Sequence, residues 1–187
     1  MRDLTKIFHQ QAMESTMAAS AMLLRIDSNV PARQGVMLAG GWVRDTYFGV
    51  KPKDMDFAFW GMSESDMRQV LHMFVMRSPY DVTVAEFEQY EGGDARLALV
   101  IKVTEMQPDG PVDMDWILYR ATNPQDVLEA FDHSLNAFYM RYDPDFRLMV
   151  GHHGEWGVCT RNHSVDCSEE RADRMREMAR IVDWEYV

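Results

Sequence analysis

The sequence predicts an α+β fold in which a mixed or antiparallel sheet is flanked by helices. Stretches with helical periodicity are interspersed with stretches that alternate as strands do, and Gly, Pro and Asp turns separate neighbouring strands as in hairpins. The 187 residues, 47% of them hydrophobic, are enough for one ordinary domain with a buried core. We expect a head domain at residues 1–150. An extension at 151–187 should carry an amphipathic helix packed on or near this head.

The first part of the chain is expected to alternate between helices and short strands. Apolar residues at helical spacing predict the first helix, and breaks at Asp, Pro and Gly end each element. Ser63 is the expected N-cap of the third helix. The expected ranges are helix 4–25, strand 35–39, helix 42–48, strand 55–60 and a helix that follows Ser63 and runs to 76.

Strands dominate the second part of the chain. Turn residues at 91–94, 108–111 and 143–145 separate apolar segments that alternate as strands do. Asn123-Pro124 has the pattern of an N-cap followed by proline in the first helical turn. The expected ranges are strands 82–87, 97–103 and 112–119, a helix from 123 to about 131, a hairpin of 136–142 and 147–150, and a charged helix at 168–184.

The charge of the chain limits the kinds of partner. Its formal net charge is −11, whereas proteins that hold a long stretch of nucleic acid usually carry a basic surface. We therefore do not expect an extensive nucleic-acid surface. No apolar run approaches the roughly 20 residues that cross a membrane, and the first residues do not resemble a secretory signal. With two cysteines, no disulfide framework is implied, so we expect a cytoplasmic protein without a membrane partner.

Two glycines, Gly40 and Gly41, stand between the expected strand 35–39 and the helix after it. Without side chains there, the backbone can approach a ligand closely, and amides at the positive end of a helix attract phosphate. Arg44 falls in the first helical turn and offers a guanidinium suited to phosphate oxygens. Many strand–helix turns use two glycines for geometry alone, so this segment does not identify a ligand by itself.

Two pairs of aspartates occur on or beside expected strands. Asp54 and Asp56 are two residues apart, as are Asp113 and Asp115, so each pair shares one face of its strand. Carboxylates suit Mg²⁺, and two metal ions about 3.5–4 Å apart support an in-line displacement at phosphorus. A solvated strand edge with no role in binding is the simpler alternative for either pair alone.

Together these segments resemble the first motif of the class II tRNA nucleotidyltransferases (CCA-adding enzymes) and bacterial poly(A) polymerases. The family pattern is GGxVRDxxLG, a short gap and KDxDF. This chain has Gly40-Gly41-x-Val43-Arg44-Asp45-x-x-Phe48-Gly49 and then Lys53-Asp54-x-Asp56-Phe57, with Phe48 in place of the usual Leu. The resemblance implies the polymerase β-like nucleotidyltransferase fold of the catalytic head domain. It further implies that Asp54 and Asp56 bind two Mg²⁺ ions, and that the triphosphate is held by Gly40, Gly41 and Arg44, with Lys53 nearby.

A second segment is similar to another part of the family pattern. There, an acidic residue on a strand stands five positions before an Arg, as Asp115 stands before Arg120. The resemblance therefore implies that Asp115 is the third catalytic carboxylate and metal ligand, in preference to Asp113. Asp113 is a further candidate metal ligand.

A third segment, Asp132-His133-Ser134-Leu135-Asn136-Ala137, resembles the family's RRDFTINA. The resemblance implies that Asp132 and Asn136 help to hold the nucleotide. Ala130 and Phe131 stand where the family has two arginines, so part of its positive charge near the nucleotide is absent from this motif.

The similarity then fades. The family's EDxxR motif, which reads the base edge of ATP or CTP, is only partly matched by Glu170-Arg171-Ala172-Asp173-Arg174, and a solvated charged helix is the simpler interpretation. The helical neck, body and tail that hold tRNA in the family have no counterpart in these 187 residues. The resemblance thus covers the catalytic head domain.

A cluster of His and Cys near residue 160 raises the question of zinc. His153, Cys159, His163 and Cys167 lie close in sequence and are ligand types that zinc accepts. Their spacing matches no defined zinc motif, so a polar hairpin with scattered histidines is the simpler alternative.

The sequence therefore predicts a minimal, metal-dependent nucleotidyltransferase. It would transfer a nucleoside monophosphate from an NTP, ATP or CTP, to an acceptor hydroxyl on an RNA 3′ end or a protein, with two Mg²⁺ ions. The family would place such an enzyme in tRNA processing. The alternative is a repurposed, non-catalytic head domain that binds a nucleotide or a partner.

Overall fold

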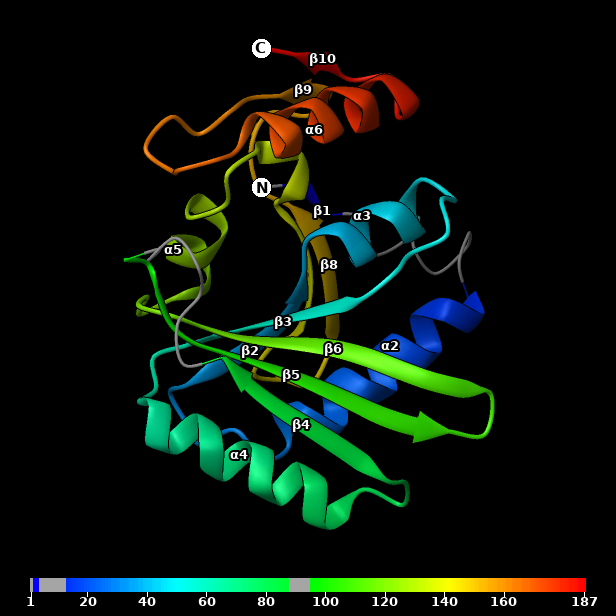
Figure 1. Cartoon of the computed structure of the whole chain (residues 1–187), viewed down its shortest axis with the longest axis vertical. Coiled ribbons are helices and arrows are strands. Elements are labelled where there is room, and N and C mark those ends of the chain that lie inside the picture. Colours follow the sequence, from blue (N-terminus) through cyan, green and yellow to red (C-terminus); the bar gives the residue numbers. More distant parts are fainter. Residues whose placement is uncertain (1, 4–12, 88–94) are drawn as a thin grey trace.

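A computed structural model describes residues 2–3, 13–87 and 95–187 of the chain. Figure 1 shows a curved sheet with helices against it. The strands are β1 (Arg2–Asp3), β2 (Gly35–Ala39), β3 (Met55–Trp60), β4 (Val82–Phe87), β5 (Leu97–Gln107), β6 (Gly110–Tyr119), β7 (Phe138–Tyr142), β8 (Leu148–His152), β9 (Val158–Cys159) and β10 (Glu185–Tyr186). The helices are α2 (Met13–Asp27), α3 (Gly41–Tyr47), α4 (Glu64–Arg77), α5 (Pro124–Glu129), the 3₁₀ turn η1 (Ser134–Asn136) and α6 (Glu169–Ile181).

Eight strands of the described residues form the main sheet, in the order β1-β8-β7-β2-β3-β6-β5-β4. Neighbouring strands in this sheet are antiparallel, except that β3 and β6 are parallel. The sheet is therefore mixed, and the predicted α+β class is confirmed. The parallel pair at its centre is what brings two separate segments of the chain into register.

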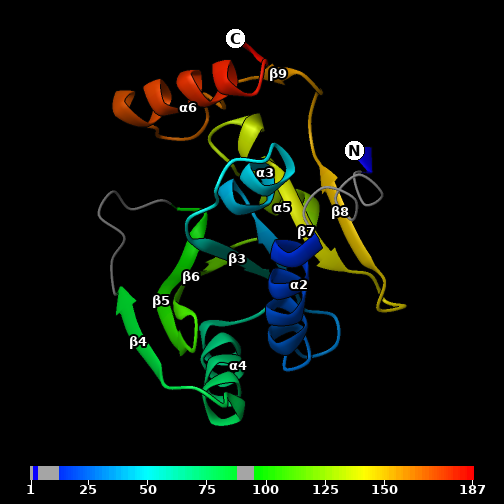
Figure 2. The same ribbon diagram turned by 90° about the vertical axis from the view of Figure 1, so that its right-hand side faces the viewer.

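Side chains alternate between the two faces of the central strands. On one face, Val36 and Leu38 of β2 and Phe57 of β3 join the large core, which includes residues of α2 and α4. On the other face, Met37 of β2 and Ala58 of β3 join a smaller cluster that includes residues of α5. Figure 2 shows α2 and α4 near one another beside the sheet.

Local signals read from the sequence explain several boundaries. Ser63 and Asp66 form a capping box at the start of α4, because each side chain accepts from the other's backbone amide. Asn123 caps α5 by accepting from the amides of Gln125 and Asp126. The expected helices and strands from residue 35 onward are confirmed, with shifts of a few residues at their ends.

The ends of several helices and strands differ from those predicted from the sequence. The helix predicted at 4–25 is observed as Met13–Asp27, and residues 4–12 lie outside the described part, as does the turn predicted at 91–94. Strands β5 and β6 extend closer to each other than expected, with Gln107 paired to Gly110. Asn136 lies in η1 and not in the first strand of the hairpin, because a 3₁₀ turn precedes β7.

The segment after β8 gathers at one end of the molecule, opposite α4 (Figure 1). There β9 and β10 pair in parallel, and α6 connects to both. Trp184, just after α6, is buried in the large core with its ring 5.8 Å from that of Phe138. Trp184 thus packs against β7 of the main sheet. None of the helices in the described part is both long enough and apolar enough to span a membrane.

Candidate functional site

Asp56 and Asp115 lie side by side at the centre of the sheet. They are register partners on the parallel strands β3 and β6. Alternation puts them on the same face as Ala58 and Ile117, which is the face of the smaller hydrophobic cluster. Asp56 and Asp115 belong to acidic segments that lie far apart in the sequence. The parallel pairing of β3 with β6 brings these two residues together.

The charges of three carboxylates interact at this point. Burial, and then the negative charges of Asp115 and Asp54, raise the pKa of Asp56 to about 7. Burial is also the main reason why the pKa of Asp115 is raised, and Asp54 adds to that rise. Lys102 opposes it, with Nζ 4.0 Å from Asp115 Oδ1. Carboxylates whose negative charges raise one another's pKa favour either a shared proton or a bound cation.

The other predicted metal ligands lie at the edge of this group. Asp54 and the neighbouring Lys53 are exposed in the segment that leads into β3. Asp113 is exposed on β6 and accepts a 2.7 Å hydrogen bond from the Thr104 hydroxyl on β5. Its charge reaches Asp115, but its side chain is held toward β5. The structure therefore pairs Asp56 with Asp115 and brings the charge of Asp54 to both, with Asp113 at the edge. The ligand atoms of Asp54, Asp56 and Asp115 do not all lie within 4.8 Å of one another.

Gly40 makes the turn between β2 and α3 against the carboxylates. Its φ of +81° favours glycine, and a Cβ at this position would lie 3.3 Å from Asp56 Oδ2. The sequence predicts that the Gly40 amide binds a phosphate. In the structure this amide donates to the Phe138 carbonyl at 2.9 Å. Helix geometry leaves the next amides, of Gly41, Trp42 and Val43, as the donors at the start of α3.

Arg44 is buried below this turn. Its Nε donates to Asp45 Oδ1 at 2.7 Å, and its Nη1 donates to Asn136 Oδ1 at 2.7 Å. Asn136 Nδ2 in turn donates to Asp132 Oδ1 at 3.1 Å. Arg44 thus fixes the orientation of Asn136 and, through it, of Asp132. The contact of Arg44 with a phosphate, expected from the sequence, stays a prediction.

Asp132 is the end of this chain of hydrogen bonds. Arg171 of α6 forms a close ion pair with it through Nε, and Arg171 Nη2 lies 3.3 Å from Asp132 Oδ1. Although Asp132 is buried, hydrogen bonds and the charge of Arg171 hold its pKa well below the ordinary range. Asp132 is therefore a fixed anion, unlike Asp56.

One cavity of about 350 Å³ joins the two groups. Asp56 and Asp115 line one part of it, and Asp132, Arg171 and Arg96 line another. Ala58, Ile117, Tyr119 and Phe131 contribute apolar wall. A cavity lined by carboxylates, by two arginines and by aromatic side chains could bind a charged ligand that also contains a ring.

Arg171 and Arg96 are the site residues that sequence reasoning missed. Ala130 and Phe131 line the cavity where the family pattern has arginines, and Arg171 reaches the same space from a helix 40 residues later. Its charge also lowers the pKa of Asp56, against the effect of burial. The only sequence signal was the partial EDxxR match at 170–174, where Arg171 counted as a mismatch.

The four candidate zinc ligands that the sequence suggested do not come together, which agrees with the simpler alternative of scattered histidines. His153 Nε2 lies 3.7 Å from a Glu129 carboxylate oxygen at α5, and Cys159 is buried in the large core. Within the described ranges, the group of three potential ligands whose donor atoms all lie within 4.8 Å is Asp132, His133 and Cys167. Only Cys167 belongs to the predicted set, because folding carries the other members to different elements.

The sequence matches the profile of the poly A polymerase head domain over residues 36–152. This range includes the Gly40 turn, the three carboxylates and Asn136, and ends with β8. No curated protein matches the sequence.

Solved structures of CCA-adding enzymes share the fold at low sequence identity. A Thermotoga maritima CCA-adding enzyme complexed with tRNA aligns with TM-score 0.63 and 17% identity. Complexes of a CCA-adding enzyme with ATP and with CTP align with TM-scores of 0.62 and 0.60, at 18% and 16% identity. Each alignment covers 100% of this chain and 42% of the other, so this chain spans less than half of their length.

Proposed function

Since the chain belongs to the poly A polymerase head domain family, a family of metal-dependent nucleotidyltransferases, we propose that it catalyses nucleotidyl transfer. The acceptor hydroxyl oxygen attacks the α-phosphorus of an NTP, the bond to the β-phosphate oxygen breaks, and pyrophosphate leaves. The observation that carries this proposal is the pairing of Asp56 with Asp115 beside the Gly40 turn, where the charge of Asp54 acts on both.

The carboxylates fit Mg²⁺. They are hard oxygen ligands, and a bound cation would stabilise the ionised forms of Asp56 and Asp115, whose pKa values are raised by burial and by neighbouring carboxylates. Asp54, Asp56 and Asp115 would hold two ions, with Asp113 at the periphery. Bound Mg²⁺ would favour ionisation of the acceptor hydroxyl and offset charge on the leaving pyrophosphate. Asp115 would orient the acceptor hydroxyl.

The nucleotide would lie in the cavity that connects the carboxylates to Asp132. The start of α3 at Gly41, Arg44 and Lys53 would hold the β- and γ-phosphates, and Gly40 leaves room for them next to Asp56. Asp132 and Asn136 would hold the ribose. This assignment agrees with the orientation of the Asn136 amide, which Arg44 and Asp132 fix from both sides.

Arg171 and Arg96 would provide the positive charge that Ala130 and Phe131 do not. Both arginines line the cavity, and the charge of Arg171 already acts on Asp56. The apolar wall would accept the base of ATP or CTP, the nucleotides named for the CCA-adding enzymes of the same fold.

The acceptor would be an RNA 3′ end or a protein hydroxyl. A CCA-adding enzyme of similar fold is complexed with tRNA, which makes an RNA 3′ end, and with it a role in tRNA processing, the first acceptor to test. The net charge of −11 argues that this chain by itself holds only a short end of RNA. Both cysteines are free thiols, so we place the activity in the cytoplasm.

The test is transfer of α-³²P label from each NTP, with Mg²⁺, to total RNA and to proteins of a cell lysate. We expect label in an acceptor, and loss of at least about 1000-fold in Asp54→Ala and Asp56→Ala, since metal binding contributes several kcal/mol. Asp109→Ala, which removes an exposed carboxylate from the turn between β5 and β6, is the control and should keep full activity. Equal labelling by the wild type and both variants would contradict the proposal.

The second candidate is a head domain that binds a nucleotide without transferring it. The ion pair of Arg171 with Asp132 favours it, because this pair occupies a residue that the nucleotide would use. Equilibrium binding of each NTP separates the two candidates: saturable binding that Asp132→Asn weakens, with no labelled acceptor under Mg²⁺ or Mn²⁺, supports the binding protein.

A further inference from the structure

Asp132, His133 and Cys167 form a second cluster of potential metal ligands, next to the cavity but apart from the three carboxylates. We propose that these three side chains bind a divalent cation that prefers thiolate and imidazole ligands, of which Zn²⁺ is the representative. Neither the family match nor the sequence pattern implies this site.

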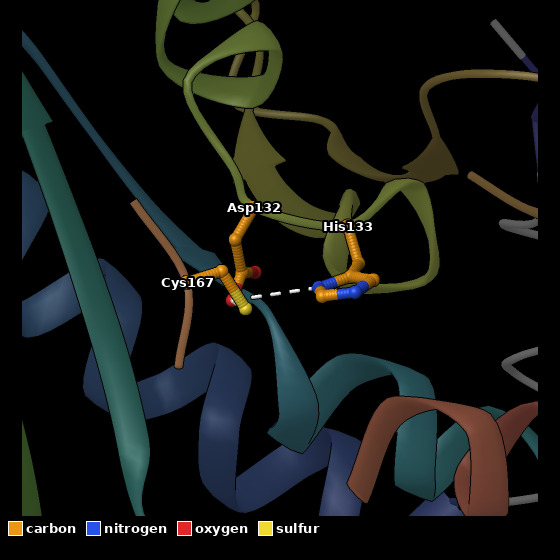
Figure 3. Close-up of side chains that lie close together, drawn as sticks. All are labelled: Asp132, His133 and Cys167. Atoms are coloured by element: carbon orange, nitrogen blue, oxygen red, sulfur yellow. Dashed lines mark hydrogen bonds and ion pairs between the residues drawn. The ribbon is translucent and has the colours of Figure 1, made fainter. Parts of the chain in front are cut away.

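The distances within the cluster suit a tetrahedral metal. His133 Nδ1 lies 3.5 Å from Asp132 Oδ2, and Cys167 Sγ lies 3.8 Å from the same oxygen. Bonds of about 2.0 to 2.3 Å at tetrahedral angles separate such ligand atoms by about 3.3 to 3.8 Å. The third separation, between sulfur and nitrogen, is at most 4.8 Å, which a small rotation of the Cys167 side chain shortens. Figure 3 shows that the three side chains point toward one another.

His133 gives an independent indication. It is 0% exposed, and its Nδ1 has Asp132 Oδ2 at 3.5 Å as an ion-pair partner but makes no closer hydrogen bond among the described residues. A buried polar atom with so distant a partner is poorly satisfied, and a metal ion between the two side chains would satisfy it. The other ring nitrogen, Nε2, lies 3.1 Å from the Tyr186 hydroxyl, a contact that would orient the imidazole as outer-shell partners of metal ligands do.

Charge and access also fit. A carboxylate and a thiolate bring two negative charges, which one divalent cation balances. Arg171 now neutralises Asp132, and its side chain is 45% exposed, so it can turn into the cavity when a metal takes its place. Asp132 and Cys167 both line the cavity, which gives a cation, and a water molecule as fourth ligand, a route from solvent.

The metal would link the C-terminal segment 151–187, through Cys167, to Asp132 and His133 in the segment 1–150. Asp132 and His133 lie between α5 and η1, whereas Cys167 lies just before the N-cap of α6. If Asp132 also holds the ribose, a consequence that depends on the proposed function, Zn²⁺ and NTP would compete for it. Micromolar Zn²⁺ would then weaken NTP binding at fixed Mg²⁺.

The experiment is a titration of the purified full-length, reduced chain with Co²⁺, which reports thiolate and tetrahedral coordination by absorption. We expect one Co²⁺ per chain to bind at this site, with visible d–d bands and a near-ultraviolet sulfur-to-cobalt band that Zn²⁺ abolishes. Cys167→Ser should lose the sulfur-to-cobalt band and bind at least about tenfold more weakly. Cys159→Ser, which changes the other buried cysteine, is the matched control and should keep both bands.

A wild type without a sulfur-to-cobalt band would overturn the proposal, as would a band that persists in Cys167→Ser. A second measurement covers a variant that fails to fold: Zn²⁺ should raise the Tm of the wild type and of Cys159→Ser, and no rise in the wild type counts against the site. Asp54→Ala should keep the cobalt bands while it abolishes nucleotidyl transfer, so the two proposals fail separately.

Discussion

Asp56 and Asp132 line the same cavity, yet their carboxyl pKa values move in opposite directions. Asp56 lies beside Asp115 and Asp54, and its pKa rises to about 7. Asp132 has Arg171 and Asn136 as partners, and its pKa falls. Burial raises both, so the neighbours decide the sign. A crowded set of carboxylates suits a metal ion, whereas a neutralised carboxylate suits a hydroxyl group or a fixed structural role.

Among variants that keep every proposed metal ligand, the largest loss of activity should come from a side chain added at the Gly40 turn beside Asp56. Gly40→Ala puts a Cβ 3.3 Å from Asp56 Oδ2 and strains a φ of +81°. Displacement of the metal ligands should lower nucleotidyl transfer about 100-fold. Gly49→Ala is the control, because it carries the same kind of strain at φ +70° with nothing within 4 Å. If both variants lose activity equally, backbone strain and not the contact with Asp56 is responsible.

Asp132→Asn should produce the largest loss of stability. The substitution removes the partner of Arg171 and leaves buried donors poorly matched, so we expect the free energy of unfolding at pH 7 to drop by about 3 kcal/mol. Since the folded pKa of Asp132 is lowered, its contribution is present above about pH 4 and is lost as the pH falls further. Urea unfolding of wild type and variant at pH 7 and pH 3 measures this. A difference that is the same at both pH values would contradict it.

Asp56→Asn should act in the opposite direction. The folded pKa of Asp56 is raised, so the wild type loses stability as the pH rises from about 4 through 7. Without metal, the variant should be more stable than the wild type by about 2 kcal/mol at pH 8 and equally stable at pH 4. Excess Mg²⁺ should stabilise the wild type and reverse the order. Unfolding with and without a chelator tests this, and a less stable variant at pH 8 without metal would refute it.

The smallest effect should follow from Lys102→Gln. Lys102 Nζ lies 4.0 Å from Asp115 Oδ1, and about half of the lysine side chain is exposed. Loss of this competing cation should raise the affinity for Mg²⁺ about twofold at low ionic strength, with less change in high salt. A Mg²⁺ titration at two salt concentrations measures the difference. Weaker Mg²⁺ binding in the variant would mean that Lys102 helps to hold the site together.

The local elements were largely predictable from sequence. Ser63 and Asn123 are capping residues whose effect depends on the next three residues, so they mark helix starts without knowledge of the rest. Short apolar stretches next to turn residues likewise predicted β2 and β3. In each case the decisive interaction lies within a few positions of chain.

The candidate site was only partly predictable. The segment Gly40–Asp56 contains the glycine turn and the predicted metal ligands Asp54 and Asp56. The resemblance to the family pattern selected Asp115 as the third carboxylate and added Asp132 and Asn136. The candidate zinc ligands at 153–167, which the sequence left open, lie apart because proximity in sequence does not determine which side chains lie close in space. Arg171 was missed for the converse reason, since it meets Asp132 across 39 residues of chain.

By itself, the sequence determined the α+β elements, the caps and turns that bound them, and the acidic and glycine-rich segments from which the site is made. These depend on periodicity and on contacts between near neighbours. The tertiary structure decided that β3 and β6 run parallel, which brings Asp56 beside Asp115, and that α6 returns to place Arg171 on Asp132 and Cys167 next to His133. These contacts depend on the order of the strands and on the packing of α6. No local sequence pattern encodes them, because the free energy that stabilises them comes from burial of surfaces that are far apart in the chain.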